Sequence, residues 1–362
     1  MANISGNRPL VALASLLLTI AAACSDGVVS PEASAGNPST APTTTAPSTT
    51  STSTTTTTTT STPPATPAPA TAGNPLLGSS FYVNPFSRAK QTADSWRSTR
   101  PADALQMDKI ATQSVAVWLG NWNSNIQADA NNQSAAITSA GAIPVFVAYN
   151  IPQRDCGGLS GGGGATPDAY RTWITGLANG IGVRKAVVIL EPDALANMGC
   201  LSAADQQTRL DLFRFAVATL RAKGQIFVYL DAGHSAWQSA ATMADRLIRA
   251  GVEGANGFSL NVSSFGYTAS NTTYGEAISS RIGGKHFVID TSRNGLGPTA
   301  DNQWCNPAGR AIGNRPTAVT GNALVDAYLW IKVPGESDGA CNGYPVSGTW
   351  MPEYALGLAQ RG

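Results

Sequence analysis

Residues 186–190 read Ala-Val-Val-Ile-Leu and lead directly into Glu191-Pro192-Asp193. The run is apolar at every position, whereas a strand with one face in water alternates apolar and polar residues. It therefore predicts a strand buried on both faces, as in the parallel sheets of α/β proteins. Six further runs of this kind occur along the chain, at residues 115–118, 143–149, 226–230, 257–262, 286–289 and 327–333.

The segment between two of these runs, residues 202–223, has the pattern of an amphipathic helix. Ser202 can cap its start with Asp205 three positions later, and Gly224 can end it. One helical face collects the apolar side chains Leu210, Phe213, Val217 and Leu220. Strands that alternate with helices are joined by right-handed crossovers, and seven of them favour a distorted β/α barrel of parallel strands over an open doubly wound sheet.

Composition excludes several classes of function. The 362 residues are 43% hydrophobic and 12% charged, which is too apolar for a chain that is disordered throughout. Lys and Arg number 23 against 22 Asp and Glu, so there is no basic surface for nucleic acid or an acidic membrane. With two histidines and neither His-Glu-x-x-His nor Cys-x-x-Cys, no metal site is expected.

The first 72 residues differ from the rest of the chain. Residues 1–24 contain Arg8 and an apolar run at 10–23, which predicts a signal peptide and an exported protein. Cys24 follows three alanines, so the segment ends either in a cleavage site or in a lipobox that anchors the chain to the cell surface. Residues 25–72 are rich in Ser, Thr and Pro and predict an extended linker, which leaves residues 73–362 as one globular domain.

Carboxylates follow four of the predicted strands. The residues concerned are Asp155, Glu191, Asp193, Asp231, Glu336 and Asp338. A single Asp after a strand is commonly a helix cap or a turn residue. Four such positions in a chain so poor in charge indicate a shared site, because active sites of α/β barrels form where the strands end. Paired carboxyl groups acquire different pKa values, as cleavage of a glycosidic bond requires.

Three tryptophans fall near the same strand ends. Trp118 ends the first run, Trp237 follows His234, and Trp304 precedes Cys305. Flat apolar side chains at such positions can stack on sugar rings, although some of the eight tryptophans belong to the core.

From about Asn74 to its C-terminus the sequence resembles glycoside hydrolase family 6, the cellulases and cellobiohydrolases. Two segments carry the resemblance, Val-Ala-Tyr-Asn-Ile-Pro-Gln-Arg-Asp-Cys-Gly at 147–157 and Val-Val-Ile-Leu-Glu-Pro-Asp-Ala-Leu-Ala at 187–196. Residues 229–234, 287–293, 304–305 and 332–338 fit the rest of the family pattern. The resemblance implies a barrel of fewer than eight strands, a monomer without a cofactor, and hydrolysis of β-1,4-glucan with inversion at the anomeric carbon.

The resemblance also implies roles for single residues. Asp193 corresponds to the general acid, and Asp155 to the partner that raises its pKa and orders the attacking water. Asp231 stabilises the site, and Asp338 matches a candidate base that is engaged with Arg or Lys. Tyr149 crowds the sugar ring that is cleaved and favours a distorted ring.

Further positions match substrate ligands of the family. Trp118 and Trp304 would stack on one side of the scissile bond and Trp237 on the other. The hydroxyl ligands would be His234, Lys332 and Glu336. Family members often carry a serine six positions after the residue equivalent to Asp155, where this chain has Gly161, so Ser160 is the candidate hydroxyl.

Four cysteines lie in the predicted domain, and they allow three pairings that spacing alone does not distinguish. The resemblance implies Cys156 with Cys200 and Cys305 with Cys341.

The segments between the motifs are short, without the long insertions that roof the substrate tunnel of exo-acting members. We therefore expect an open cleft and a secreted endo-β-1,4-glucanase. The alternatives are an exo-acting cellobiohydrolase of the same family and a noncatalytic glucan-binding lipoprotein. The four aspartates favour an enzyme, because a binding protein gains little from carboxylates that must be desolvated.

Overall fold

The computed structural model describes residues 73–362, so the predicted signal peptide, Cys24 and the linker lie outside the described residues. The strands are β1 (Val117–Gly120), β2 (Val145–Tyr149), β3 (Ala186–Leu190), β4 (Ile226–Asp231), β5 (Gly257–Leu260), β6 (His286–Asp290) and β7 (Val325–Leu329). The helices are α1 (Arg88–Trp96), α2 (Pro101–Ala111), α3 (Ile126–Ser139), α4 (Pro167–Ile181), α5 (Ala203–Arg221), α6 (Ala240–Arg249), α7 (Thr268–Ser279) and α8 (Pro352–Arg361). Single 3₁₀ turns occupy Asp155–Gly157, Met198–Cys200 and Val252–Gly254.

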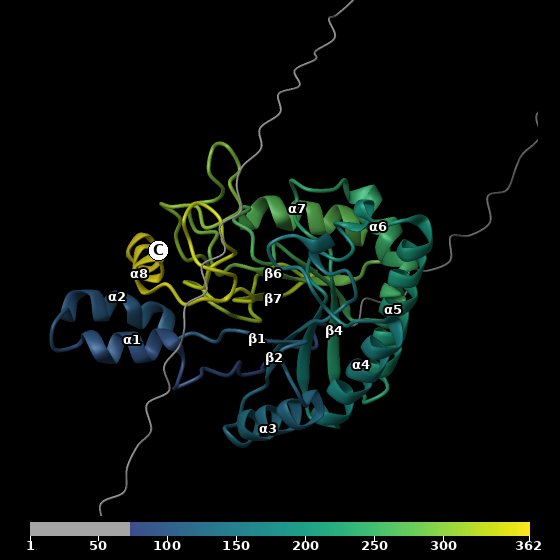
Figure 1. Ribbon diagram of the computed structural model, residues 1–362, viewed down its shortest axis with the longest axis horizontal. Coiled ribbons are helices and arrows are strands. Elements are labelled where there is room, and N and C mark those ends of the chain that lie inside the picture. The colour runs from purple at the N-terminus through teal and green to yellow at the C-terminus, as the bar shows by residue number, and fades with distance from the viewer. Residues whose placement is uncertain (1–72) are drawn as a thin grey trace, which may run out of the picture. The chain divides into compact units, whose positions relative to one another are not determined.

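The seven strands form one curled sheet in the order of the chain, and each neighbouring pair is parallel. The sheet is not closed by pairing of β1 with β7. Instead, the backbone N–H of Ala116 donates to the carbonyl of Trp330 at 2.9 Å across the seam between the two edge strands. The distorted α/β barrel of seven parallel strands is therefore confirmed, and all carboxyl ends of the strands lie at one rim (Figure 1).

The central strands follow the apolar runs closely, and β3 has the predicted bounds. The two edge strands do not. β1 begins at Val117 rather than residue 115, and β7 ends at Leu329 rather than residue 333. Beyond β7 the backbone N–H groups of Ile331 and Lys332 donate to the carboxylate of Asp290 (3.2 and 2.9 Å), so a side chain replaces a strand as their partner. The apolar pattern does not reveal such a replacement.

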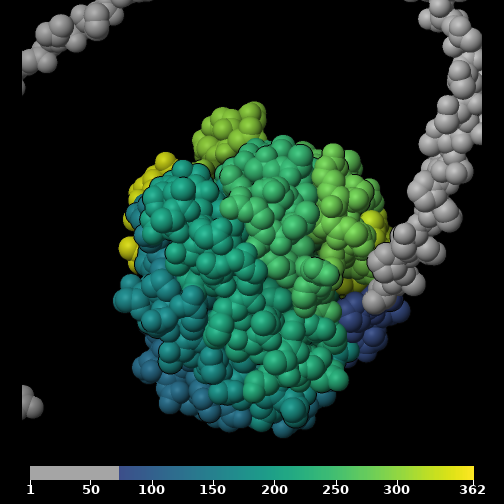
Figure 2. Space-filling model, turned by 90° about the vertical axis from the view of Figure 1, so that its right-hand side faces the viewer, coloured from purple at the N-terminus to yellow at the C-terminus, as the bar shows by residue number. Residues whose placement is uncertain are grey.

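The core has two layers, one inside the curled sheet and one between the sheet and its helices. The interior is filled by side chains such as Val147, Ile189 and Tyr229, all fully buried. The outer layer packs strand residues against the helices. Figure 2 shows the outer side as a continuous surface in teal and green, the colours of residues from about 150 to 280.

Helix α5 begins and ends as the sequence predicts. The hydroxyl of Ser202 accepts from the N–H of Asp205 at 3.1 Å, and the predicted apolar face is buried. Gly224, at φ +80°, turns the chain back towards β4. The start of the helix is thus fixed. This places Arg209, whose guanidinium donates to the carbonyls of Ala194 and Pro152 in two loops of the rim.

Helices α1, α2 and α8 lie together beside the seam (Figure 1). They share a separate apolar cluster with Trp330, which is 1% exposed. Within residues 73–362, no helix is both long and apolar enough to cross a bilayer.

Candidate active site

Two of the predicted aspartates are joined through the backbone. The N–H groups of Asp193 and Gly233 donate to the carboxylate of Asp231 at 2.9 and 3.0 Å, and the hydroxyl of Ser259 lies 3.3 Å from it. Asp231 ends β4 and is fully buried, whereas Asp193 follows β3 and keeps partial contact with solvent. Asp231 therefore fixes the turn that presents the Asp193 carboxyl group.

The carboxyl groups of this rim influence one another. Desolvation raises the pKa of Asp193 well above its usual value, and the nearby carboxylates of Asp231, Asp155 and Asp338 raise it further. Burial raises the pKa of Asp231 to about 7, although its three hydrogen-bond donors oppose the shift. The arrangement favours the protonated form of Asp193, which is the form that a general acid requires.

Asp338 has the opposite environment. Burial alone would raise its pKa, but the charges of Arg293 and Lys332 outweigh this effect and lower the pKa. The guanidinium of Arg293, which is fully buried, donates to the Asp338 carboxylate at 2.9 Å, and the ammonium of Lys332 lies 3.4 Å away. The N–H of Asn306 adds a third contact at 3.0 Å. Asp338 is therefore held as a carboxylate by two cations.

Asp155 lies in the glycine-rich loop that follows β2. Its carboxylate accepts from the N–H of Ser160 at 2.9 Å, and its backbone is left-handed, at φ +52°. The neighbouring Arg154 is 6% exposed and donates to the carbonyls of Tyr149 and Ser160 at 2.6 and 2.8 Å. Its guanidinium also lies 4.3 Å from the centre of the Tyr149 ring. Arg154 thus folds the loop back onto the strand that carries it.

The glycine-rich loop also touches the segment that follows β7. The hydroxyls of Ser160 and Ser347 lie 3.2 Å apart, and Ser347 donates to the carbonyl of Asp338 at 2.7 Å. Cys156 is bonded to Cys200, and Cys305 to Cys341, so the pairing implied by the family resemblance is confirmed. Each disulfide joins two neighbouring loops of the rim.

The predicted aromatic residues differ in how far they are available to a ligand. Tyr149 is 6% exposed and meets Trp118 edge to face, with ring centres 5.1 Å apart. The indole N–H of Trp118 donates to the carbonyl of Ile331 at 2.9 Å across the seam. Trp237 lies with its ring centre 5.5 Å from that of His234 and is 37% exposed, and Trp304 is 61% exposed. The last two present free faces to solvent.

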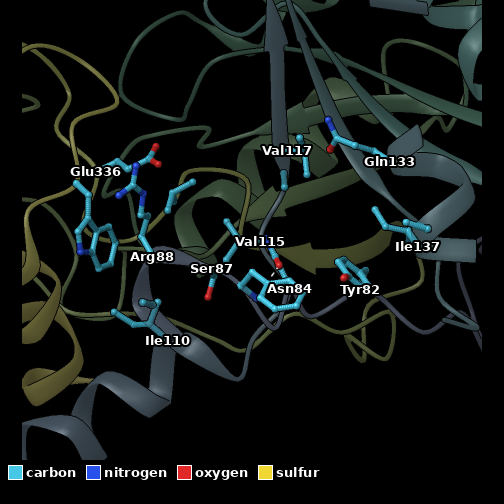
Figure 3. Close-up of a pocket in the computed structure, with 16 residues that line it drawn as sticks. Tyr82, Asn84, Ser87, Arg88, Ile110, Val115, Val117, Gln133, Ile137 and Glu336 are labelled. Atoms are coloured by element: carbon cyan, nitrogen blue, oxygen red, sulfur yellow. Dashed lines mark hydrogen bonds between the residues drawn. The ribbon is translucent and has the colours of Figure 1, made fainter. Parts of the chain in front are cut away.

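Glu336 lies at the edge of this group, beside a cavity of about 410 Å³ at the seam (Figure 3). Arg88 and Glu336 stand at one end of the cavity, Gln133 and Ile137 at the other, and Val117 between them. Burial raises the pKa of Glu336, while the charges of Lys332 and Arg88 lower it. Glu336 therefore lies between two cations. One is Lys332, which also contacts Asp338, and the other is Arg88, which lines the cavity.

Buried charged residues of the rim that the sequence did not single out are Arg154, Asp290 and Arg293, and Glu191 was named among the carboxylates after the strands but was given no role. All four lie within segments that fit the family pattern, but their type and spacing do not state their contacts. Only Glu191 had a signal in the sequence, because it directly follows the fully apolar strand β3, where a charge is costly unless it is paired. Across residues 73–362, no group of three or more His, Cys, Asp or Glu side chains is placed to hold a metal ion.

Comparison with known proteins gives consistent matches. The family model of the glycosyl hydrolases family 6 matches residues 76–362. Endoglucanase A of Cellulomonas fimi is 45% identical over 284 residues, covering 78% of this chain, which spans 61% of that protein's length. Endoglucanase 1 of Streptomyces halstedii is 43% identical over 289 residues, covering 76% of this chain and 87% of its own.

Solved structures agree with these matches. The endoglucanase Cel6 from Mycobacterium tuberculosis, in complex with a methyl-cellobiosyl-4-deoxy-4-thio-β-D-cellobioside, superposes with a TM-score of 0.77 at 46% identity. The match covers 80% of this chain and 99% of that one.

Proposed function

Because the chain belongs to the glycosyl hydrolases family 6, we propose that it is an endo-β-1,4-glucanase that hydrolyses cellulose or a related β-glucan with inversion. The observation that carries the proposal is the carboxyl group of Asp193, whose pKa is raised by burial and by three neighbouring carboxylates. An acid that stays protonated near neutral pH can protonate the leaving glycosidic oxygen.

In this mechanism Asp193 is the general acid, and the other aspartates act on it and on the water. Asp231 holds the Asp193 backbone, and Asp155 helps to keep the acid protonated and orders the attacking water. An inverting enzyme needs room for water between the sugar and the base, so the base does not adjoin the acid. Asp338, the candidate base, is engaged with Arg293 and Lys332, and the lowered pKa makes it a weak proton acceptor.

The remaining predicted residues hold the glucan. Tyr149 would crowd the sugar ring at the cleavage point, and Trp118 packs edge to face against it. Trp118 and the exposed Trp304 would stack on sugar rings on one side of the scissile bond, and Trp237 on the other side. The side chains of His234, Lys332, Glu336 and Ser160 would form hydrogen bonds with the hydroxyl groups of the glucan.

Alignment lengths support endo rather than exo action. The match to the probable 1,4-beta-D-glucan cellobiohydrolase C of Aspergillus niger runs over 357 positions but takes in 79% of this chain, about 286 of its 362 residues. About 70 aligned positions therefore have no counterpart here. The Cellulomonas fimi match, over 284 residues and 78% of this chain, needs almost no such insertions. An open cleft follows if those insertions roof the substrate path.

Export completes the proposal. The N-terminal segment, with its apolar run at 10–23, would direct the protein out of the cell, either free or held by a lipid at Cys24. The linker at 25–72 would then separate the monomeric catalytic domain from the membrane or the cleavage site. The two disulfides suit such an oxidising compartment.

The test uses a soluble β-1,4-glucan and follows viscosity and new reducing ends together, for the wild type and for Asp193→Ala. Internal cleavage predicts a steep fall in viscosity while few ends have formed, and neither change in the variant. A rise in reducing ends at nearly constant viscosity would instead indicate exo action. Binding without new ends on every β-glucan would indicate a noncatalytic glucan-binding protein.

A further inference from the structure

Two buried charged side chains, Glu191 and Arg209, lie beneath the loops that carry Asp155 and Asp193. Glu191 is fully buried and follows β3 directly, and Arg209 is 3% exposed on α5. Burying a charge is costly unless hydrogen bonds compensate it. Most of the hydrogen bonds that compensate these two charges are made to backbone groups of the loops that carry Asp155 and Asp193.

The carboxylate of Glu191 holds the start of the loop that follows β2. It accepts from the N–H of Asn150 at 2.9 Å and from the N–H of Ile151 at 3.0 Å. That loop reaches Asp155 four residues after Ile151. Glu191 itself stands two residues before Asp193, and both have left-handed backbones, at φ +52° and +70°. One side chain thus links the backbone that leads to Asp155 with the backbone that leads to Asp193.

Arg209 makes the same connection from the helix side. Its guanidinium donates to the carbonyls of Pro152 and Gln153 at 3.0 and 2.9 Å. It also donates to the carbonyl of Ala194, the residue after Asp193, at 3.1 Å. The three carbonyls belong to the two loops that Glu191 joins. Arg209 on α5, as a donor, and Glu191 after β3, as an acceptor, therefore hold the same two loops.

We propose that Glu191 and Arg209 are positioning residues that set the separation of the Asp155 and Asp193 carboxyl groups. The inference rests on the proposed function, because the consequence of that separation is the acidity of Asp193. Both side chains are buried beneath the loops, so they act through the backbone of the loops.

The electrostatics give this role a distinctive readout. The carboxylates that raise the pKa of Asp193 are Asp231, Asp155 and Asp338, and Glu191 is not among them. Around Glu191 itself, burial raises the pKa to about 7, while the N–H groups of the loop, the Tyr170 hydroxyl and Arg154 lower it. If the loop relaxes, the Asp155 carboxylate moves away from Asp193 and the pKa of Asp193 falls. Loss of Glu191 therefore acts on the acid through the position of Asp155.

The test compares Glu191→Gln with the wild type in the full chain. The variant keeps the size of the side chain, but it has no charge. The N–H groups of Asn150 and Ile151 both donate to Oε2, and the Asn150 N–H also lies 3.1 Å from Oε1, where the amide –NH₂ of glutamine cannot accept, so the hold on the loop is weakened. We expect kcat on a soluble cello-oligosaccharide to fall roughly tenfold to a hundredfold, as small displacements of reacting groups do. KM should stay within about twofold, and the alkaline limb of the pH profile of kcat/KM should move to lower pH, because Asp193 becomes more acidic.

Asp326→Asn provides a matched control. Asp326 is also fully buried. Its carboxylate accepts from the Tyr229 hydroxyl at 2.6 Å and lies 2.7 Å from Nδ1 of His286. It is, however, the second residue of β7 and therefore lies at the opposite end of the barrel. This variant should lose stability without moving the alkaline limb. If Glu191→Gln fails to fold, Arg209→Lys serves as the second variant, because one ammonium cannot reach all three carbonyls.

The outcomes separate the two proposals. An unchanged alkaline limb in Glu191→Gln or Arg209→Lys, with activity lost only in proportion to stability as in Asp326→Asn, would overturn the positioning role. A wild type that cleaves no β-glucan would instead contradict the proposed function.

Discussion

The pairing of Asp338 with two buried cations predicts a large and pH-dependent cost for removing its charge. In Asp338→Asn the side-chain oxygen can still accept from Asn306, so the loss is that of the charge facing Arg293 and Lys332. Breaking a buried ion pair by removing one partner costs about 3–5 kcal/mol. Burial already lowers the pKa of Lys332, so this residue can release its proton, and we expect a loss near the lower end, about 3 kcal/mol.

Urea unfolding of the full chain, followed by tryptophan fluorescence, measures this loss. The pKa of Asp338 in the folded state lies below its ordinary value of about 3.9. The ionised carboxylate therefore contributes fully to the free energy of unfolding above about pH 3.9, and this contribution is lost as the pH falls below that value. The difference in the free energy of unfolding between wild type and variant should therefore be the same at pH 7 and pH 5 and smaller at pH 3.

Asp168→Asn is the control. Asp168 pairs with Arg171 at 2.7 Å, but its side chain is 93% exposed, so this variant should change the free energy of unfolding by less than about 1 kcal/mol. A loss below about 1 kcal/mol for Asp338→Asn, or a difference that does not change at pH 3, would refute the reasoning.

Three further predictions concern the acid, one stacking platform and one disulfide. Asp231→Asn removes a negative charge that raises the pKa of Asp193, so the alkaline limb of kcat/KM should move to lower pH, and an unmoved limb would contradict the coupling. Trp304→Ala should raise KM for long oligosaccharides several-fold, by about 0.5–1.5 kcal/mol of stacking, while the unfolding temperature stays constant because the side chain is 61% exposed. Replacing both Cys305 and Cys341 by alanine should lower the free energy of unfolding by about 3–4 kcal/mol, since the bond closes a loop of 36 positions, and calorimetry that finds no shift would exclude this contribution.

The fold was predictable because apolar content alone decides a strand that is buried on both faces. β3 and the central strands follow their apolar runs, and the cap of α5 is visible as Ser202 with Asp205. The edge strands were less predictable, since their limits depend on contacts distant in the sequence. The Asp290 carboxylate ends β7 by binding the backbone 41 and 42 positions later, and no local pattern announces this.

The candidate site shows the same division. Aspartates after strands indicated a shared rim, because parallel strands bring their carboxyl ends together. Their different environments could not be derived from type and spacing. Asp338 is ionised because Arg293, 45 positions away, is buried against it, whereas burial and the neighbouring carboxylates raise the pKa of Asp193. The structural role of Glu191 was equally hidden, because its partners are backbone N–H groups of another loop.

The central claim is that Asp193 protonates the leaving oxygen of an inverting hydrolysis, and the anomeric configuration of fresh products tests it most directly. The full chain and Asp193→Ala are each incubated with a soluble cello-oligosaccharide while proton NMR follows the anomeric signals before mutarotation. The account predicts that the wild type releases the α-anomer first and that the variant releases almost none. The β-anomer as first product, or undiminished α-anomer from the variant, would contradict it.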